Sequence, residues 1–155
     1  MNKELTYKLV DFTEELISLL LLADESTEAI NKYLPYCTLL VGYDRNNKPK
    51  AIMALYPKSN TQIEIKNIAV HTTLQSHGIG SYLLSYAKRY AVLNHFKTLL
   101  VGTGDVNYRQ INFYTKNGFK THSVRKNFFL DNYKKPIYDD GKQLVDMVVL
   151  EYKIR

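Results

Sequence analysis

Hydrophobic and polar residues follow two different spacings along this chain. Short apolar runs such as TLLVGY and AIMALY are typical of buried strands, and longer segments with an apolar residue at every third or fourth position are typical of helices. The pattern predicts strands over residues 6–11, 38–43, 51–56, 63–70, 98–102, 119–129 and 144–152, and helices over residues 13–23, 26–34, 81–96 and 108–117.

Capping and turn residues support these boundaries. Thr13 and Ser26 stand where N-caps are needed, Pro35 ends the second helix, and Gly118 follows the last helix in the usual C′ position. The turn before Pro49 makes its flanking strands a hairpin, and a turn-rich loop, DNYKKPIYDDG, precedes the last strand.

The order of elements, β-α-α-β-β-β-α-β-α-β-β, predicts an α/β fold in one domain over residues 1–155. We expect a mixed sheet of about seven strands with about four helices, antiparallel in its first half. Strands 63–70 and 98–102 are joined through a helix, so they should be parallel. Ligands of such sheets bind at the carboxyl ends of the strands, which places Val70 and residues 102–104 around one cleft.

The charge of the chain narrows the choice of partners. Residues 63–155 carry 14 basic and 7 acidic side chains, whereas residues 1–62 carry 7 basic and 8 acidic ones. A positive field in the second part would attract a polyphosphate ligand, although a solubility surplus on solvated faces explains the same count. Nucleic acid is a weaker interpretation, because the lysines form no dense run and the sequence contains no zinc, basic-zipper or RNP-type motif.

Other sequence features favour a cytoplasmic protein without a metal. The longest apolar run, residues 16–23, is too short to cross a membrane, and acidic residues interrupt an N-terminus that does not resemble a signal peptide. Cys37 is the only cysteine, so no internal disulfide can form. Its apolar neighbours favour a packed, inert thiol over a nucleophile. No spacing of His, Cys and Asp indicates a metal site.

One glycine-rich turn carries the clearest chemical signal. The segment QSHGIG, residues 75–80, lies between a predicted strand and a predicted helix. The free N–H groups and the dipole of a helix N-terminus would form an anion site there, and Gly78 and Gly80 would let phosphates approach the backbone. A turn that needs glycine only for its shape explains these six residues equally well. A Walker loop is excluded because no Lys-Ser/Thr follows, and a dinucleotide fingerprint because position 83 is Leu83.

Two motifs in sequence order carry a family resemblance. The first, IKNIAVHTTLQSHGIGSYLL, contains a strand, a Q-x-x-G-x-G turn and a helix start, and the second is NYRQINFYTKNGF. In the second motif Asn107 stands seven residues before Tyr114, and Gly118 and Phe119 close it. The chain thus resembles the GNAT superfamily of acetyl-coenzyme A-dependent N-acetyltransferases over essentially its full length. Gln110 departs from the family pattern, in which alanine is usual.

The resemblance implies acetyl-CoA as a co-substrate and gives several residues a role. Backbone groups of Ile68, Ala69 and Val70 would pair with the pantetheine arm as an added strand does. Asn107 would hydrogen-bond the pantetheine, and Tyr114 would act as the general acid for the departing thiolate; a core aromatic with a wet tip is the alternative for Tyr114. The pyrophosphate would be held by the backbone N–H groups of Gln75, Ser76, His77, Gly78, Ile79, Gly80 and Ser81.

The reaction also requires a base, because an amine is protonated at neutral pH. Glu64 is our candidate, since strand alternation places it on the same face as Lys66; a surface Glu–Lys pair explains the pattern equally well. Asp105 is the rival base, unless it caps the helix that follows. His71 and His122 are weaker candidates for the same role.

We expect direct attack in a ternary complex, with the oxyanion bound by the backbone N–H of Val70. In this family the acceptor side is built by the first two helices and the loop between the last strands, here residues 13–34 and 126–142. We expect a small-molecule primary amine; a protein or peptide N-terminus and a non-catalytic acyl-CoA-binding module are the alternatives. The resemblance also suggests a homodimer. The loop offers aromatic residues that could receive a cationic amine, plug a cavity or form a dimer contact: Phe128, Phe129, Tyr133 and Tyr138.

Overall fold

The computed structural model describes residues 5–155, which fold around a seven-stranded mixed sheet. Every neighbouring pair of strands is antiparallel except β4 and β5, which are parallel. Two further strands, β7 (Tyr138–Asp139) and β8 (Lys142–Gln143), form a separate short hairpin. Across the sheet the strands are β1 (Thr6–Val10), β2 (Thr38–Tyr43), β3 (Pro49–Pro57), β4 (Gln62–Val70), β5 (Thr98–Gly104), β9 (Met147–Lys153) and β6 (Lys120–Arg125).

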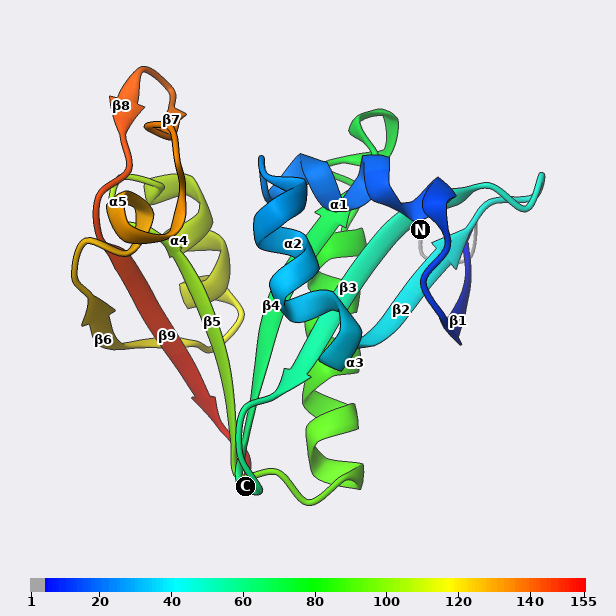
Figure 1. The fold of residues 1–155 in the computed structure, drawn as a ribbon. Coiled ribbons are helices and arrows are strands. Elements are labelled where there is room, and N and C mark those ends of the chain that lie inside the picture. The colour runs from blue at the N-terminus through cyan, green and yellow to red at the C-terminus, as the bar shows by residue number, and fades with distance from the viewer. Residues whose placement is uncertain (1–4) are drawn as a thin grey trace.

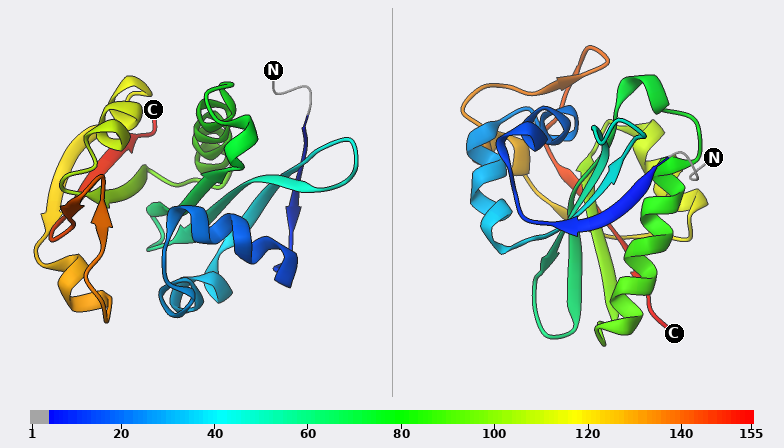
Figure 2. Two further views of the ribbon diagram at one scale, coloured as in Figure 1. Left: turned by 90° about the horizontal axis from the view of Figure 1, so that it is seen from above. Right: turned by 90° about the vertical axis from the view of Figure 1, so that its right-hand side faces the viewer.

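Helices connect the strands and cover both faces of the sheet (Figure 2). No helix within residues 5–155 is long and apolar enough to cross a membrane. The α-helices are α1 (Ile17–Ala23), α2 (Thr27–Tyr33), α3 (Ile79–Leu93), α4 (Tyr108–Lys116) and α5 (Phe128–Asn132), and the 3₁₀ turns are η2 (Glu14–Leu16), η3 (Leu34–Tyr36) and η4 (Thr72–Leu74).

Two buried clusters, one on each face, hold the helices to the sheet. On one face, Leu83 and Ala87 of α3 pack with Ile65 of β4. On the other face, Leu20 of α1 packs with Ile52 of β3. Apolar burial contributes roughly 25 cal/mol per Å² to stability. The two clusters therefore hold α1 and α3 firmly against the sheet.

The parallel strands β4 and β5 pair only over their first halves. Their register ends at the pair Ile65 and Val101, and beyond it the two strands separate (Figure 1). The next residue of β4, Lys66, is a β-bulge, because its neighbours pair with the consecutive residues Ala54 and Leu55 of β3. Bulges bend strands and change their direction. The bulge therefore marks the point where β4 turns away from β5 and leaves backbone groups of both edges unpaired.

Most of the predicted architecture is confirmed. The sheet has seven strands, and strands 63–70 and 98–102 pair in parallel. Ser26 is an N-cap, since its Oγ accepts a hydrogen bond from the Ala29 N–H at 3.1 Å. Thr13 precedes η2 but makes no capping bond with its side chain. The predicted helix 13–23 is consequently divided into η2 and α1.

The C-terminal segment differs most from the prediction. The predicted strand 119–129 ends at Arg125, and α5 replaces its last residues. Asn127 causes this change, because its left-handed φ of 56° cannot continue a strand. The last strand begins at Met147 rather than at Leu144, since the β7–β8 hairpin occupies the preceding residues.

Helix α3 is shifted toward the N-terminus relative to the predicted helix 81–96. It begins at Ile79, directly after Gly78, whose φ is 81°. It ends at Leu93, and His95 then takes a φ of 66° that reverses the chain. The last two residues of the glycine-rich turn, Ile79 and Gly80, therefore belong to the first turn of the helix.

Candidate active site

The turn before α3 presents a row of free backbone donors. Within residues 5–155, no N–H group from Gln75 to Ser81 donates a hydrogen bond to the protein, and the first helical bond runs from Tyr82 N to the Gly78 carbonyl at 3.1 Å. Positive φ angles at Ser76 (67°) and Gly78 (81°) create a concave turn of successive N–H groups. The seven residues predicted to hold a pyrophosphate thus form unpaired donors at the positive end of a 15-residue helix.

Glycine at position 80 allows α4 to approach this turn. A Cβ atom at Gly80 would lie 3.0 Å from Cζ of Phe113, which is tighter than an ordinary contact. The residue therefore has a packing role in addition to any close approach of a ligand. The contact brings α4, with Asn107 and Tyr114, beside the start of α3.

The side chain of Asn107 has an unused acceptor. Its Nδ2 donates to Thr103 Oγ1 at 3.3 Å, whereas its Oδ1 is buried and has no partner among residues 5–155. A buried polar atom without a partner costs about 1–3 kcal/mol. Asn107 lies three residues beyond β5, at the carboxyl end of that strand. Beyond the pair Ile65 and Val101, β4 and β5 no longer pair, and we call the region between these strand ends the opening. The free oxygen of Asn107 can accept a hydrogen bond from an amide N–H of a ligand bound there.

Tyr114 combines a buried ring with an unpaired hydroxyl. The residue is 4% exposed, and its ring packs against Phe113 and Phe119 at centroid distances of 5.2 and 5.8 Å. Burial raises the pKa of the hydroxyl above its ordinary value, so the oxygen keeps its proton at neutral pH. The hydroxyl makes no hydrogen bond with the described residues and is not among the fully enclosed polar atoms. A neutral hydroxyl with a free proton meets the first requirement of a general acid.

The open edge of β4 offers backbone groups of Ile68 and Val70. The N–H of His71 donates to the Lys50 carbonyl of β3 at 2.7 Å. Because successive N–H groups of a strand point to opposite edges, Ile68 and Val70 turn theirs away from β3 and toward the opening. Ala69 turns its own backbone toward β3. Of the three residues predicted to pair with pantetheine, Ile68 and Val70 therefore keep free N–H groups, although the Val70 carbonyl accepts a hydrogen bond from Gln75 Nε2 at 3.0 Å.

Glu64 lies in a buried ion pair, so the interpretation as a surface pair is wrong. It is 3% exposed, and its Oε1 and Oε2 accept hydrogen bonds from Nη2 and Nη1 of Arg125 at 3.2 and 3.3 Å. Lys66 Nζ lies 3.7 Å from Oε2. The guanidinium fills one acceptor site on each oxygen, so the carboxylate keeps further acceptor sites beside the ion pair. The role of Glu64 as the general base stays a prediction.

The other candidate bases have local partners. Asp105 Oδ1 accepts a hydrogen bond from the Val145 N–H at 3.2 Å. Asp105 does not cap α4, because the N-cap position belongs to Asn107. His71 is the N-cap residue of η4, and His122 is exposed on β6. Within residues 5–155, no hydrogen bond joins any of these three side chains to the unpaired groups of the N–H row, Asn107 or Tyr114.

Cys37 behaves as a packed thiol. Burial raises the pKa of its thiol to about 12, so the nucleophilic thiolate is scarce at neutral pH. Within residues 5–155, no group of three or more His, Cys, Asp and Glu side chains is arranged to hold a metal ion.

A polar network that sequence reasoning missed lies on the α1–α2 face. Asp24, between α1 and α2, accepts hydrogen bonds from the hydroxyls of Tyr133 (Oδ1, 2.9 Å) and Tyr33 (Oδ2, 3.3 Å). The Tyr33 hydroxyl in turn accepts from Asn67 Nδ2 of β4 at 3.1 Å. Burial raises the pKa of the Asp24 carboxyl, and these hydrogen bonds lower it in part. No local motif could reveal the network, because Tyr133 is 109 residues from Asp24.

Comparison with known proteins identifies the family. Residues 8–119 match the acetyltransferase (GNAT) family. The uncharacterized N-acetyltransferase YvbK of Bacillus subtilis (strain 168) is 34% identical over 137 residues, which are 88% of each chain. The crystal structure of a GNAT family acetyltransferase from Elizabethkingia anophelis with acetyl-CoA bound is 38% identical, with a TM-score of 0.91 over 97% of this chain and 98% of that one. The IAA acetyltransferase from Bacillus cereus ATCC 14579 is 30% identical, with a TM-score of 0.89 over 96% and 99%.

This chain belongs to the GNAT acetyltransferase family. It is an acetyl-CoA-dependent N-acetyltransferase with the α/β fold of that family. The match ends at Phe119, the last residue of the second motif, so it contains both motifs from which the resemblance was predicted. Family membership leaves the acceptor undetermined.

Proposed function

We propose that this enzyme transfers the acetyl group of acetyl-CoA to a primary amine of a small molecule, by direct attack of the amine in a ternary complex. The observation that carries the proposal is the presence of unpaired groups on the segments that follow the carboxyl ends of β4 and β5. These groups are the N–H row at residues 75–81, the buried Oδ1 of Asn107 and the hydroxyl of Tyr114.

The donor side fits the parts of coenzyme A. The N–H row supplies neutral donors and a helix dipole for a pyrophosphate without a charged side chain. The free edge of β4 at Ile68 and Val70 suits the amide groups of a pantetheine arm, and Asn107 adds an acceptor for one of its N–H groups. The bound coenzyme supplies an activated acetyl thioester, and the residues of the chain orient it.

The chemistry asks for one proton donor, one oxyanion donor and a neutral amine. Tyr114 is proposed as the proton donor, since its high pKa keeps the hydroxyl protonated and its proton is not used elsewhere. The N–H of Val70 is proposed as the oxyanion donor, since it faces the opening and is not needed by β3. The amine must lose its proton before it attacks. A carboxylate is proposed to accept that proton, and Glu64 is the candidate.

A small acceptor is supported by the contacts across the acceptor side. Tyr133 bonds to Asp24 in the α1–α2 connection, and Lys134 Nζ lies 3.3 Å from Glu28 Oε2 in the first turn of α2, so the segment after α5 contacts both places. An extended peptide would require these contacts to open. The related IAA acetyltransferase of Bacillus cereus also carries a small-molecule name, which supports the proposal for this chain.

The first test combines binding and turnover. Calorimetry with acetyl-CoA measures donor binding, and release of CoA in the presence of small primary amines measures transfer. We expect Tyr114→Phe to lower kcat by roughly 100-fold, the usual scale of general acid catalysis, with little change in the Kd for acetyl-CoA. Tyr152→Phe, in a tyrosine that packs on the same core at 5.8 Å from Phe119, is the matched control and should retain turnover.

Three outcomes separate the candidates. Unchanged turnover in Tyr114→Phe would remove Tyr114 as the acid. Acetyl-CoA binding without transfer to any small amine, but with acetylation of peptide N-termini, would favour the peptide acceptor. Binding without any transfer would leave a non-catalytic acyl-CoA-binding module as the function.

A further inference from the structure

Asp24 lies where four segments of the chain meet. It belongs to the connection between α1 and α2, and its partners come from α2 (Tyr33), from β4 through Asn67, and from the end of α5 (Tyr133). A third hydrogen bond reaches Oδ1 from the Ser26 N–H at 3.3 Å. The network therefore joins β4, through Asn67, to the α1–α2 segment and to the segment after α5.

The network contains acceptors that the protein leaves unfilled. Oδ1 of Asp24 accepts two hydrogen bonds and Oδ2 only one, whereas a carboxylate has about four acceptor sites. Asn67 is 3% exposed, and its Nδ2 donates to the Leu20 carbonyl at 2.9 Å and to Tyr33. Its Oδ1 is buried without a partner among the described residues. A ligand group with several N–H donors would fill the free acceptor sites of both Asp24 and Asn67.

Asp24 also has no cation within salt-bridge distance among the described residues, although the charge of Lys66 acts on it from farther away. Within residues 5–155 it forms no salt bridge, because the neighbouring cations contact other carboxylates. Arg125 and Lys66 contact Glu64, and Lys134 contacts Glu28. A half-buried carboxylate without a cation is costly in a folded protein. The cost is offset if a ligand supplies the cation.

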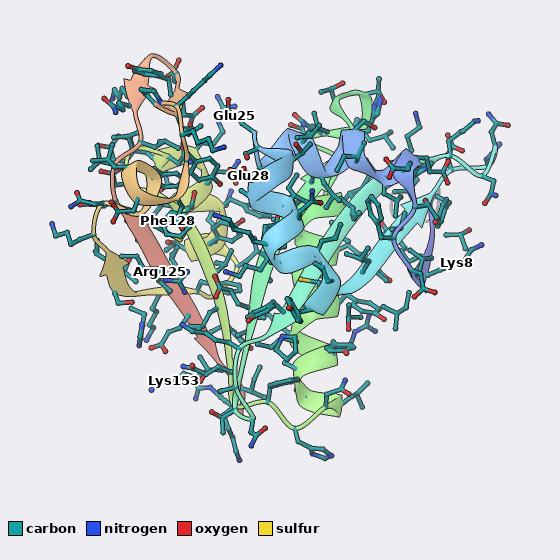
Figure 3. All side chains as sticks on the ribbon, in the orientation of Figure 1. Lys8, Glu25, Glu28, Arg125, Phe128 and Lys153 are labelled. Atoms are coloured by element: carbon teal, nitrogen blue, oxygen red, sulfur yellow. The ribbon has the colours of Figure 1, made fainter. Side chains whose placement is uncertain are left out.

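The surroundings suit a positively charged ligand. Phe129 stacks on Tyr133 at 5.8 Å, and Phe128 meets Tyr133 edge-on at 6.5 Å. Figure 3 shows Glu25 and Glu28 on the α1–α2 side of the opening and Phe128 on the α5 side. Aromatic faces and exposed carboxylates both attract cations. This local acidity contrasts with the net charge of +6 of the whole chain.

We infer that Asp24 binds the ammonium group of the acceptor, which is therefore a small primary amine that carries a positive charge in solution. The inference rests on the proposed function, because it names the acceptor of the same reaction. The ammonium donates to Oδ2 of Asp24, and the hydroxyls of Tyr33 and Tyr133 hold the carboxylate in place. Tyr33 and Tyr133 are positioning residues, and Asp24 touches the substrate.

If Asp24 served only to hold its neighbouring segments together, loss of its charge would lower the stability of the free protein. Binding of a cationic ligand by Asp24 predicts that stability is kept or raised instead. Burial raises the folded-state pKa of Asp24, so its contribution to stability is greatest below its ordinary pKa and is lost as the pH rises through the folded-state pKa. At neutral pH the ionised carboxylate is then a net cost. The groups that face it are Tyr33, Tyr133 and Lys66. Asp24→Asn should keep or raise the thermal midpoint at pH 7.5, whereas the loss of a purely structural contact would lower it.

The test uses the full chain with acetyl-CoA and three amines, namely putrescine and benzylamine as cations and aniline as a neutral amine. Asp24→Asn should raise the KM for the two cations by about 10- to 100-fold, the scale of a charged hydrogen bond, with an unchanged Kd for acetyl-CoA. Tyr133→Phe should give a smaller rise in KM. Asp44→Asn is the matched control, because Asp44 accepts from the Asn46 and Lys48 N–H groups at 2.9 Å in the β2–β3 turn. That control should lose stability and keep its KM.

The outcomes distinguish this inference from the proposed function. A wild type that does not bind acetyl-CoA would overturn the proposed function. Binding of acetyl-CoA with an unchanged KM for the cations in Asp24→Asn, or with aniline affected as strongly as benzylamine, would overturn the inference alone. If none of the amines releases CoA, calorimetry of putrescine with the CoA-loaded protein decides: wild-type binding that is lost in Asp24→Asn supports the inference, and absence of binding overturns it.

Discussion

The two sides of the opening between β4 and β5 use different kinds of polar group. The donor side, on α3 and α4, uses backbone N–H groups and the side chains of Asn107 and Tyr114 within one stretch of the chain. The proposed acceptor side uses side chains of Asp24, Asn67 and Tyr133, which come from distant segments. Backbone donors depend on local turn geometry, whereas a side-chain network depends on tertiary contacts. A local sequence motif can therefore predict the groups of the donor side, but it cannot predict those of the acceptor side.

The largest expected effect tests the backbone origin of the donor side. Gly78→Glu should weaken the binding of acetyl-CoA by at least about 100-fold, because it adds a negative charge at a phosphate site, where like charges cost several kcal/mol. It also forces a non-glycine residue into a φ of 81°. Calorimetry measures the affinity, and circular dichroism confirms the fold.

Gly141→Glu is the matched control for that change. Gly141 has a φ of 77° and open space around its Cα, so the same substitution brings the same charge and similar strain at the β7–β8 turn. Its affinity for acetyl-CoA should stay at the wild-type value. An equal loss of affinity in both variants would show that strain or charge in general, rather than the N–H row, controls binding.

The second prediction concerns the buried ion pair beneath the acceptor side. Arg125→Met should destabilise the fold by roughly 3 kcal/mol, because it leaves Glu64 buried with only Lys66 nearby. Urea denaturation measures the change. Lys126→Met, which removes an 80% exposed partner of Asp146, should have little effect.

Glu64→Gln then separates stability from catalysis. As the predicted general base, Glu64 should account for roughly 100-fold in kcat. A variant that is less stable but turns over normally below its melting temperature would instead make Glu64 a support for Arg125.

A smaller effect is expected at Asn107, the side chain of the donor side with a free acceptor. Asn107→Ala should weaken acetyl-CoA binding by about tenfold, the value of one hydrogen bond. The free protein should lose at most about 1 kcal/mol, because the change removes only the 3.3 Å hydrogen bond from Nδ2 to Thr103 Oγ1, while Oδ1 has no partner among the described residues. Asn117→Ala, which removes a bond to the Phe113 carbonyl at the other end of α4, should show the reverse pattern.

The smallest effect concerns Cys37, which lies outside both sides. With a thiol pKa of about 12, roughly one thiolate in 10,000 molecules is present at pH 8. The folded protein should therefore react slowly with 5,5′-dithiobis(2-nitrobenzoate), and the unfolded protein should react at once. Rapid reaction of the folded protein would contradict the burial of this thiol and would also disturb thiol-based measurement of CoA release.

Sequence reasoning was strongest where short-range rules apply. Ser26 was recognised as an N-cap, and the parallel pairing of β4 with β5 followed from the crossover through α3. It failed at residues 126–132, where the left-handed φ of Asn127 starts a helix in an apolar segment that reads equally well as a strand. It left open whether Glu64 is a base or part of a surface pair with Lys66, because alternation along β4 does not reveal that Arg125 of β6 covers it.

By itself the sequence determined the family, the order of strands and helices, and the turn at residues 75–81, because glycine positions and apolar spacing act over a few residues. Only the tertiary structure decided which polar groups remain unpaired. The free oxygens of Asn107 and Asn67, the pairing of Glu64 and the lack of a cation at Asp24 depend on segments that meet across the sheet. Whether a polar group is satisfied is a property of its three-dimensional neighbours, and those neighbours define where a ligand is needed.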